Sequence, residues 1–324
     1  MNRQIVITTI FAPTPAVRKY AALPGYRLLI VGDRKTPQDW ACPGAEFLAV
    51  DGPETARFKL HAVLPYNHYC RKMLGYLQAI HSGAECVVDT DDDNIPKPGW
   101  GFPGFEGEFP CLEPGRGFVN VYRYYTAQAI WPRGLPLRKI REVAPLPAVA
   151  PERLRVGVWQ GLADQDPDVD AIYRLTSDAP CEFDSRGPLV LGRGTLSPFN
   201  TQNTCIHRDL FPLLYLPAHV TFRFTDILRG LIAQPIMWLY GLHLGFLDAT
   251  VVQERNPHDY FKDFLSEIPM YQHAEKTVEA VSAAVSARIS IPDNLMRAYQ
   301  ALRECGVVED RELHTLEAWL KDLD

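Results

Sequence analysis

The stretch Glu85–Asn94, ECVVDTDDDN, places four aspartates within five residues, directly after a short apolar run. Carboxylates this close repel one another unless water or a cation screens them. An apolar run that leads straight into acids predicts a strand with the acids at its carboxyl end, where open α/β sheets bind ligands. Asp91 and Asp93 are two residues apart, so in extended backbone they point the same way. The pattern predicts an Mg²⁺ or Mn²⁺ site that also takes substrate phosphates; a solvated acidic turn is the plain alternative.

Other polar residues near the predicted strand ends could complete such a site. Arg71 and Lys72 open the helix before the acidic strand, and two cations there oppose the helix dipole unless an anion, such as a diphosphate, binds at the same end. A solvated basic pair is the alternative. Thr9 and Asp33 lie near the ends of the first two predicted strands, where both could line a nucleotide cleft. The structural alternatives are that Thr9 fills the sheet and that Asp33 caps the following turn.

Two later residues are candidates for a metal ligand and for a catalytic base. His258 follows the turn-forming Asn-Pro pair and could offer a neutral imidazole to an Mn²⁺-type site, although a loop histidine is more often an ordinary surface residue. Asp226 follows Thr225 at a predicted helix start, where it could cap the helix or act as general base for an attacking hydroxyl. No Walker A, HExxH or Ser-His-Asp order occurs in the sequence, so neither a P-loop NTPase nor a hydrolase is indicated.

The elements that must position these residues follow from local patterning. Short apolar runs predict strands at 5–10, 26–31, 47–50 and 86–88. Thr14 and Pro15 begin a predicted helix that ends near Leu23, and a second helical pattern runs from about Tyr69 to Gly83. The resulting order β-α-β-β-α-β predicts a parallel sheet of the nucleotide-binding type.

The rest of the chain divides into a loop-rich stretch and a helical tail. From about 96 to 151, Pro, Gly and aromatic residues dominate, and a connection of this length is usually functional. Its aromatics could form a platform for an acceptor or the underside of a long loop: Trp100, Tyr122, Tyr124 and Trp131. Helical patterning after Met270 predicts helices at 274–287, 295–305 and 310–323. We expect a catalytic domain over 1–270 and a helical extension over 271–324.

Composition narrows the function classes. The 324 residues carry a net charge of −6, so no basic field attracts nucleic acid. The seven cysteines form no CxxC, which indicates neither a zinc site nor a disulfide framework. No apolar run has the length of a signal peptide or a membrane span, so we expect a cytoplasmic protein.

Several runs in the sequence resemble the STELLO family of glycosyltransferase-like proteins. They cover about residues 5–265 in the same order: TTIFAPTPAVRKYA, LIVGDRKTPQDW, LPYNHYCRKMLGYLQAIHSGAECVVDTDDDN, WPRGLPL, DPDVDAIYRLT, SPFNTQNTCIHRD, TFRFTDILRG and LGFLDATVVQERNPHDYFKDF. A weaker resemblance, through a GYL helix followed by a strand ending in DDD, is to the reversibly glycosylated polypeptides, or UDP-arabinopyranose mutases. Plant STELLO proteins are Golgi membrane proteins with an anchor, which this sequence does not show.

Both resemblances imply a GT-A fold, a Rossmann-like mixed α/β sheet flanked by helices, here with the C-terminal helical appendage. They imply a nucleoside diphosphate sugar donor, UDP-linked by expectation, and Mn²⁺ or Mg²⁺ at a DxD motif. By that resemblance Asp91, Asp92 and Asp93 form the motif, and His258 is a further metal ligand. The other implied roles are nucleotide binding for Asp33 and Arg71, an acceptor-side position for Asp226, and the donor sugar or acceptor side for Asn203.

The sequence predicts a metal-dependent glycosyltransferase that transfers a sugar to a hydroxyl of a glycan, a lipid-linked or a protein acceptor. A nucleotide-sugar mutase or self-glycosylating enzyme, and a non-catalytic regulator of polysaccharide synthesis, stay open as alternatives. The donor sugar, inversion or retention at the anomeric carbon, and assembly as a homo-oligomer are not determined by the sequence.

Overall fold

The computed structural model describes residues 2–142, 145–177, 179–254 and 259–323. Within these residues a ten-stranded mixed sheet has the order β3-β2-β1-β4-β11-β8-β6-β9-β12-β5. Its strands are β1 (Arg3–Thr8), β2 (Tyr26–Val31), β3 (Ala45–Leu48), β4 (Cys86–Thr90), β5 (Asn94–Pro96), β6 (Glu106–Leu112), β8 (Val149–Gln165), β9 (Leu189–Leu191), β11 (Asn203–His207) and β12 (Leu242–Gln253). A separate pair joins β7 (Gly117–Phe118) and β10 (Thr195–Leu196).

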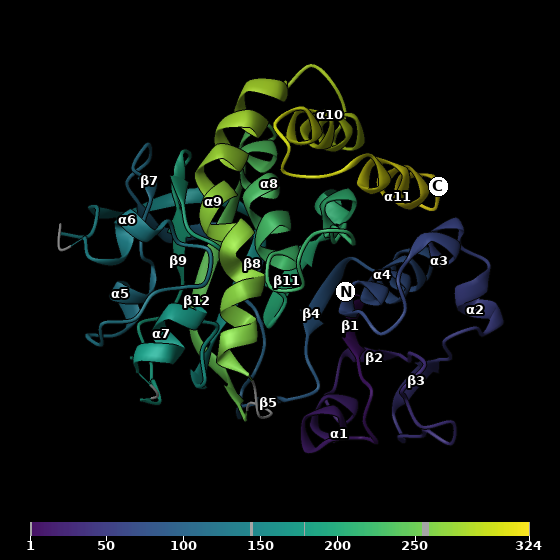
Figure 1. Cartoon of the computed structure of the whole chain (residues 1–324). Coiled ribbons are helices and arrows are strands. Elements are labelled where there is room, and N and C mark those ends of the chain that lie inside the picture. The colour runs from purple at the N-terminus through teal and green to yellow at the C-terminus, as the bar shows by residue number, and fades with distance from the viewer. Residues whose placement is uncertain (1, 143–144, 178, 255–258, 324) are drawn as a thin grey trace.

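Helices flank this sheet, and Figure 1 shows α8 and α9 side by side along it. The α-helices are α1 (Pro15–Ala21), α2 (Pro53–Ala56), α3 (Lys59–Val63), α4 (Lys72–His81), α5 (Tyr122–Tyr125), α6 (Leu137–Ile140), α7 (Ala171–Thr176), α8 (Thr225–Leu239), α9 (Tyr260–Ala284), α10 (Ile291–Glu304) and α11 (Asp310–Lys321). Two 3-10 segments are η1 (Tyr69–Arg71) and η2 (Arg208–Leu214). The predicted fold class, a mixed α/β sheet flanked by helices, is confirmed and is consistent with a GT-A-like fold. No described helix is long and apolar enough to cross a membrane.

The first four strands are parallel, as the sequence predicts, because β1 pairs with both β2 and β4 and β2 pairs with β3. Ile5 and Ile7 pack into one buried cluster and Val6 into another, so β1 is covered on both faces. Helix α4 lies very close to the sheet at Gly75, where a Cβ would come within 2.5 Å of Val6 and 2.6 Å of Val31. This contact brings the start of α4 under the carboxyl ends of the strands.

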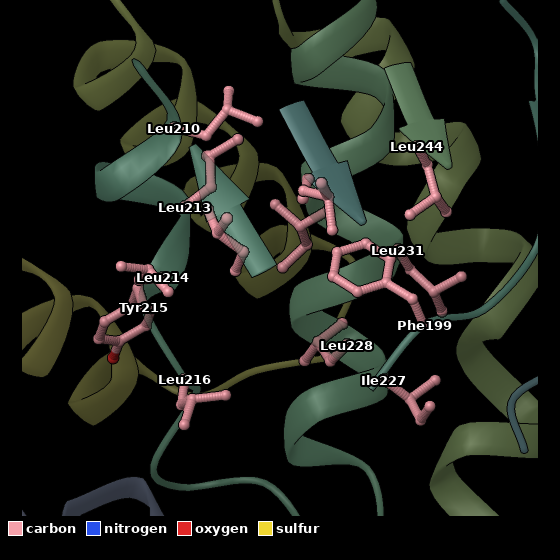
Figure 2. Packing of buried hydrophobic residues seen from close by; sticks show 14 of the residues in the cluster. Phe199, Leu210, Leu213, Leu214, Tyr215, Leu216, Ile227, Leu228, Leu231 and Leu244 are labelled. Carbon is pink, nitrogen blue, oxygen red and sulfur yellow. The ribbon is translucent and has the colours of Figure 1, made fainter. Parts of the chain in front are cut away.

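The second part of the sheet is organised around α8, which is buried from Thr225 to Met237. Figure 2 shows Leu228 and Leu231 of this helix among Phe199, Leu244 and the leucines of η2. Helix α8 ends at Leu239, and Gly241 adopts a φ of +67° before β12. A left-handed residue of this kind is the usual way for a helix to stop.

The helical tail begins earlier than its pattern indicates. Helix α9 starts at Tyr260, and the Asp259 side chain caps it, whereas the sequence predicted a start at 274. Pro269 lies inside α9 and interrupts the local signal, since proline is normally a helix breaker. Helices α10 and α11 agree with prediction, and α11 packs on α3 (Figure 1). The division into domains at residue 270 stays a prediction.

The loop-rich stretch contributes buried aromatics rather than an open platform. Trp100 is only 8% exposed and packs on the rings of Tyr20 and Tyr26. Tyr122 is also buried, and the Trp131 indole donates a hydrogen bond to Asp170. An acceptor platform built from Trp100 and Tyr122 is therefore wrong, because both rings are covered by the core.

Candidate functional site

A cavity of about 410 Å³ lies where β1, β2 and β4 end. Its size is that of a small-molecule site. One side, which we call the strand half, consists of residues that directly follow these strands: Thr9, Asp33, Asp91, Asp92 and Asp93. The opposite side, the network half, comes from scattered loops and the start of α8: Arg133, Asp168, Asn200, Thr201, Gln202, Arg223 and Asp226.

Strand pairing explains how the two halves meet. Strand β11 runs antiparallel to β4, with Asn203 opposite Thr90, so the residues before β11 lie beside the acids after β4. Strand β12 pairs with β5 and ends at Gln253, whose amide donates to Asp93 Oδ2 at 3.2 Å. His258 follows five residues later in the sequence and lies outside the described residues.

The aspartates of the DTDDDN run divide into one buried acid and three that line the cavity. Asp89 is fully buried, and its carboxylate accepts from Lys72 Nζ at 2.8 Å and from Arg229 Nη1 at 2.9 Å. Burial raises the pKa of Asp91 to about 6, with a smaller contribution from the charge of Asp93, while Lys72 opposes the rise. Asp92 accepts a hydrogen bond from Thr9 Oγ1. Asp91 and Asp93 thus face the same space, as the spacing predicts.

Lys72 is placed differently from the expectation that it contacts a bound anion. It does not line the cavity, and its ammonium donates to Asp89 at 2.8 Å, the Thr90 carbonyl at 2.8 Å and Asp91 at 2.7 Å. These three contacts use all three N–H donors of the group. Lys72 therefore holds Asp91 through a contact outside the cavity lining.

Arg71 is also buried rather than exposed to the cavity. Its Nη2 donates to the Val50 carbonyl at 3.1 Å, and its guanidinium lies 4.5 Å from the centre of the Tyr66 ring. Its Nε is 4.0 Å from Asp33 Oδ1. Neither Nε nor Nη1 has a hydrogen-bond partner among the described residues. Arg71 therefore supports Asp33 electrostatically from the side away from the cavity.

Asp33 itself lines the cavity. Its carboxylate accepts from the backbone N–H groups of Arg34 at 2.7 Å and of His68 at 3.3 Å. These bonds fix its orientation on the rim of the strand half. Asn203, in contrast, is fully buried beside the cavity, where it accepts from Trp100 Nε1 and donates to Thr250 Oγ1. It is not among the residues that line the cavity, and its predicted role at the donor sugar or acceptor stays a prediction.

The network half centres on Arg133, which the sequence did not single out. Its guanidinium binds Asp168 through Nε at 2.8 Å and Nη2 at 2.7 Å. It also binds Asp226 through Nη1 at 2.9 Å and Nη2 at 2.8 Å. Asn200 donates to Asp168 at 2.7 Å, and Arg223 pairs with the buried Glu267 at 2.9 Å. The network is therefore built of planar polar groups that hold one another in place.

Asp226 lines the cavity but is not positioned as a free base. Burial alone would raise the pKa of its carboxyl, but the paired Arg133 guanidinium outweighs that effect and the pKa is lowered. Its oxygens also lie 3.3 Å from the Tyr69 hydroxyl and from the Thr201 N–H. A carboxylate with this many donors holds its charge firmly and has little tendency to accept a proton.

The described residues contain no group of three or more His, Cys, Asp or Glu side chains arranged to hold a metal. The pair Asp91 and Asp93 remains, with hard oxygen donors and mutual repulsion that a cation would relieve. Two carboxylates suit a metal that takes its other ligands from a phosphate and water.

Comparison with known proteins confirms the resemblance to the STELLO family. The protein-family model named STELLO glycosyltransferases matches residues 223–324 of this chain. Two proteins of Arabidopsis thaliana, named probable glycosyltransferases STELLO1 and STELLO2, are each 28% identical to this chain over 348 residues. The match covers 99% of this chain and 44% of each relative, so the chain spans less than half of their length.

One solved structure, of a mycobacterial protein, is similar to this chain with a TM-score of 0.40 and 11% sequence identity. The match covers 95% of this chain and 76% of the mycobacterial chain. A score that low supports no argument about fold or function. The similarity to the STELLO proteins and the geometry of the cavity therefore carry the functional interpretation.

Proposed function

We propose that the protein is a glycosyltransferase that uses a nucleoside diphosphate sugar, UDP-linked by preference, with Mn²⁺ or Mg²⁺ held at Asp91 and Asp93. The observation that carries the proposal is the grouping of Thr9, Asp33 and the three acids at the ends of adjacent strands around one cavity. Ligands of α/β sheets bind at this edge. The similarity to proteins named as glycosyltransferases gives the reaction class.

The residues present fit a divalent cation. Asp91 and Asp93 supply hard oxygens, and Lys72 neutralises part of the charge behind them without occupying the cavity. When bound, the cation would neutralise negative charge on the leaving diphosphate. His258 stays the predicted third protein ligand. Thr9, which donates to Asp92, keeps that carboxylate oriented at the edge of the metal position.

The strand half also offers a nucleoside position at Asp33. Backbone N–H groups fix its carboxylate, which can then accept from a ribose hydroxyl or a base N–H. Arg71 lies beside Asp33, with its Nε 4.0 Å from Asp33 Oδ1.

Asp226 fits a role in orienting an acceptor better than the role of a general base. Arg133 occupies both of its oxygens and keeps its pKa low. A general base works best with a pKa near the working pH. The geometry of Asp226 therefore gives no support to inversion, which a base at this position would have favoured.

The test is thermal unfolding of the full chain with UDP, GDP, ADP and UDP-sugars, each with and without MnCl₂. We expect one nucleotide to stabilise the protein only with Mn²⁺, by about 2.7 kcal/mol at 100 times its Kd. Asp93→Asn should abolish this stabilisation. Asp51→Asn, a change at an acid whose side chain is 59% exposed outside the cavity, is the matched control. Equal nucleotide binding by wild type and Asp93→Asn would show that the metal site is wrong.

Product analysis separates the alternatives once a nucleotide binds. Release of UDP with transfer of the sugar supports the transferase. A ring-contracted sugar still bound to UDP would indicate a mutase, and Mn²⁺-dependent binding without turnover would indicate a regulator.

A further inference from the structure

Three aromatic rings stand at the side of the cavity where its two halves meet, and we call them the aromatic rim: His68, Tyr69 and Phe222. The rings of His68 and Tyr69 are stacked, with centroids 5.2 Å apart and planes at 12°. Phe222 meets both edge-on, at 5.1 Å and 4.7 Å. It is 52% exposed, so part of the ring is open beside the cavity that it lines.

The chain around Phe222 is held firmly, so its exposure belongs to an ordered segment. Thr221 donates from its hydroxyl to the Ser266 carbonyl at 2.6 Å, and the Arg223 N–H donates to Ser266 Oγ at 3.2 Å. The Tyr69 hydroxyl lies 3.2 Å from the Phe222 carbonyl oxygen. Both neighbours of Phe222 are thus tied to α9, and the ring is presented to the cavity from a fixed backbone.

Planar polar side chains of the network half line the same cavity. Asp168, Asp226 and Asn200 are buried, and their positions are set by Arg133 and by one another. Planar carboxylate and amide groups can each bind two neighbouring hydroxyls of a sugar. One face of a pyranose ring consists of C–H groups, which pack well against an aromatic ring. A polar floor beside an exposed ring is therefore suited to a saccharide.

The sheet order indicates which substrate this surface would take. Strands β1 and β2, with Thr9 and Asp33, lie on one side of β4, whereas β11 lies on the other. Residues 200–202 directly precede β11, and Phe222 precedes the helix that carries Asp226. The network half therefore lies across the acids from the proposed nucleoside position, and the aromatic rim lies between the two, since the His68 N–H also bonds to Asp33.

We propose that the network half and Phe222 form an acceptor subsite for a neutral saccharide, with a pyranose ring packed on the exposed face of Phe222. Only the assignment of the bound saccharide as the acceptor substrate rests on the proposed function. Arg133 and Arg223 are both paired with acids, so neither supplies an unpaired cation to the phosphate of a lipid-linked acceptor. Hydroxyl groups can still bind at such a neutral surface, because the Asn200 amide has two N–H donors, one of which goes to Asp168.

The test is saturation-transfer NMR on the full chain with four probes: methyl β-glucopyranoside, methyl β-galactopyranoside, methyl α-mannopyranoside and cellobiose. Titrations are recorded with and without UDP and Mn²⁺. We expect at least one saccharide to receive saturation at its ring C–H protons. Phe222→Ala should weaken its binding about tenfold, in line with the loss of one aromatic contact surface, and Phe222→Tyr should retain binding.

The matched control is Phe261→Ala, because Phe261 is 63% exposed on α9 and does not line the cavity. It should bind both saccharide and UDP as wild type does. Saccharide binding unchanged in Phe222→Ala, or no binding of any probe to wild type, would overturn the subsite. A loss of UDP binding in Phe222→Ala would assign the ring to the nucleoside instead and would also overturn it. Failure of wild type to bind any nucleotide with Mn²⁺ would contradict the proposed function alone.

Discussion

The two halves of the cavity differ in how their charge is balanced. The strand half presents Asp33, Asp91, Asp92 and Asp93, and no Lys or Arg lines it among the described residues. Arg71 and Lys72, which pair with acids of this region, are buried and do not line the cavity. In the network half, Arg133 and Arg223 line the cavity beside the acids that they neutralise.

This difference has a direct chemical meaning. A surface with excess carboxylate charge is complete only when a cation is added, whereas a surface of paired charges is already neutral and can meet an uncharged ligand by hydrogen bonds. The strand half is thus suited to a metal with a diphosphate, and the network half to hydroxyl groups. The predictions below test whether the two halves are separable in this way.

The largest expected effect is on folding, in the network half. Arg133→Met leaves Asp168 and Asp226 buried without their guanidinium, and breaking a buried ion pair in this manner costs about 3–5 kcal/mol. The free energy of unfolding in urea measures the loss. Arg138→Met, at a pair whose arginine side chain is 66% exposed, should cost far less, because water screens an exposed pair. Similar small losses in both variants would show that the network is not a stabilising unit.

A smaller effect, on metal affinity, is expected from Lys72→Met in the strand half. Asp89 keeps its bond to Arg229, so the fold tolerates the change better, but Asp91 loses the group that orients it. Loss of such an outer partner typically weakens metal binding about 10–100-fold. Titration of Mn²⁺ by electron paramagnetic resonance in the presence of UDP measures this.

The pH dependence of the Lys72 variant adds a second check. The pKa of Asp91 is already raised to about 6, and Lys72 is the group that opposes the rise. Without it more of the carboxyl is protonated near neutral pH, so the affinity gap should narrow as the pH increases. Lys262→Met, whose side chain is 82% exposed, is the control. If both variants bind Mn²⁺ as wild type does, the support from Lys72 is irrelevant to the metal.

The same contrast explains how much of the site could be predicted. Thr9, Asp33 and the acids after β4 were predicted from short apolar runs, because the end of a parallel strand is a local feature that also fixes a place in the fold. The sequence predicts which residues lie near one another better than it predicts where their side chains point. The sequence shows only that Lys72 opens the helix before the acidic strand, and its bonds to Asp89 and Asp91 depend on tertiary packing.

The network half had no comparable local signal. Arg133, Asp168 and Asn200 come from segments far apart in sequence that join only because β11 inserts beside β4 and the long strand β8 follows it. The runs WPRGLPL and DPDVDAIYRLT carry part of the family resemblance, but nothing in their spacing indicates that their charges pair. In the same way, the parallel strands and the last two helices followed from periodicity, whereas the start of α9 was hidden by Pro269.

The smallest expected effect concerns His68, which lies between the two halves. If its ring is uncharged, the aromatic rim is neutral like the network half. Burial lowers the pKa of His68 to about 4; His219 lowers it further and Asp33 opposes the shift. The unfolded chain takes up this proton near pH 6.5, before the folded protein does. Stability from the neutral ring is therefore present above pH 6.5 and is lost as the pH falls toward 4.

His68→Asn keeps a side-chain acceptor for the Cys70 N–H but removes the titration. Between pH 7.5 and 5.5 the free energy of unfolding should fall more in wild type than in the variant, by about 1 kcal/mol after allowance for partial exposure. Urea denaturation at fixed pH values measures both. If wild type instead gains stability relative to the variant as the pH falls, His68 is charged against Asp33. The aromatic rim would then belong to the charged strand half, and a saccharide face on Phe222 would lose its neutral neighbour.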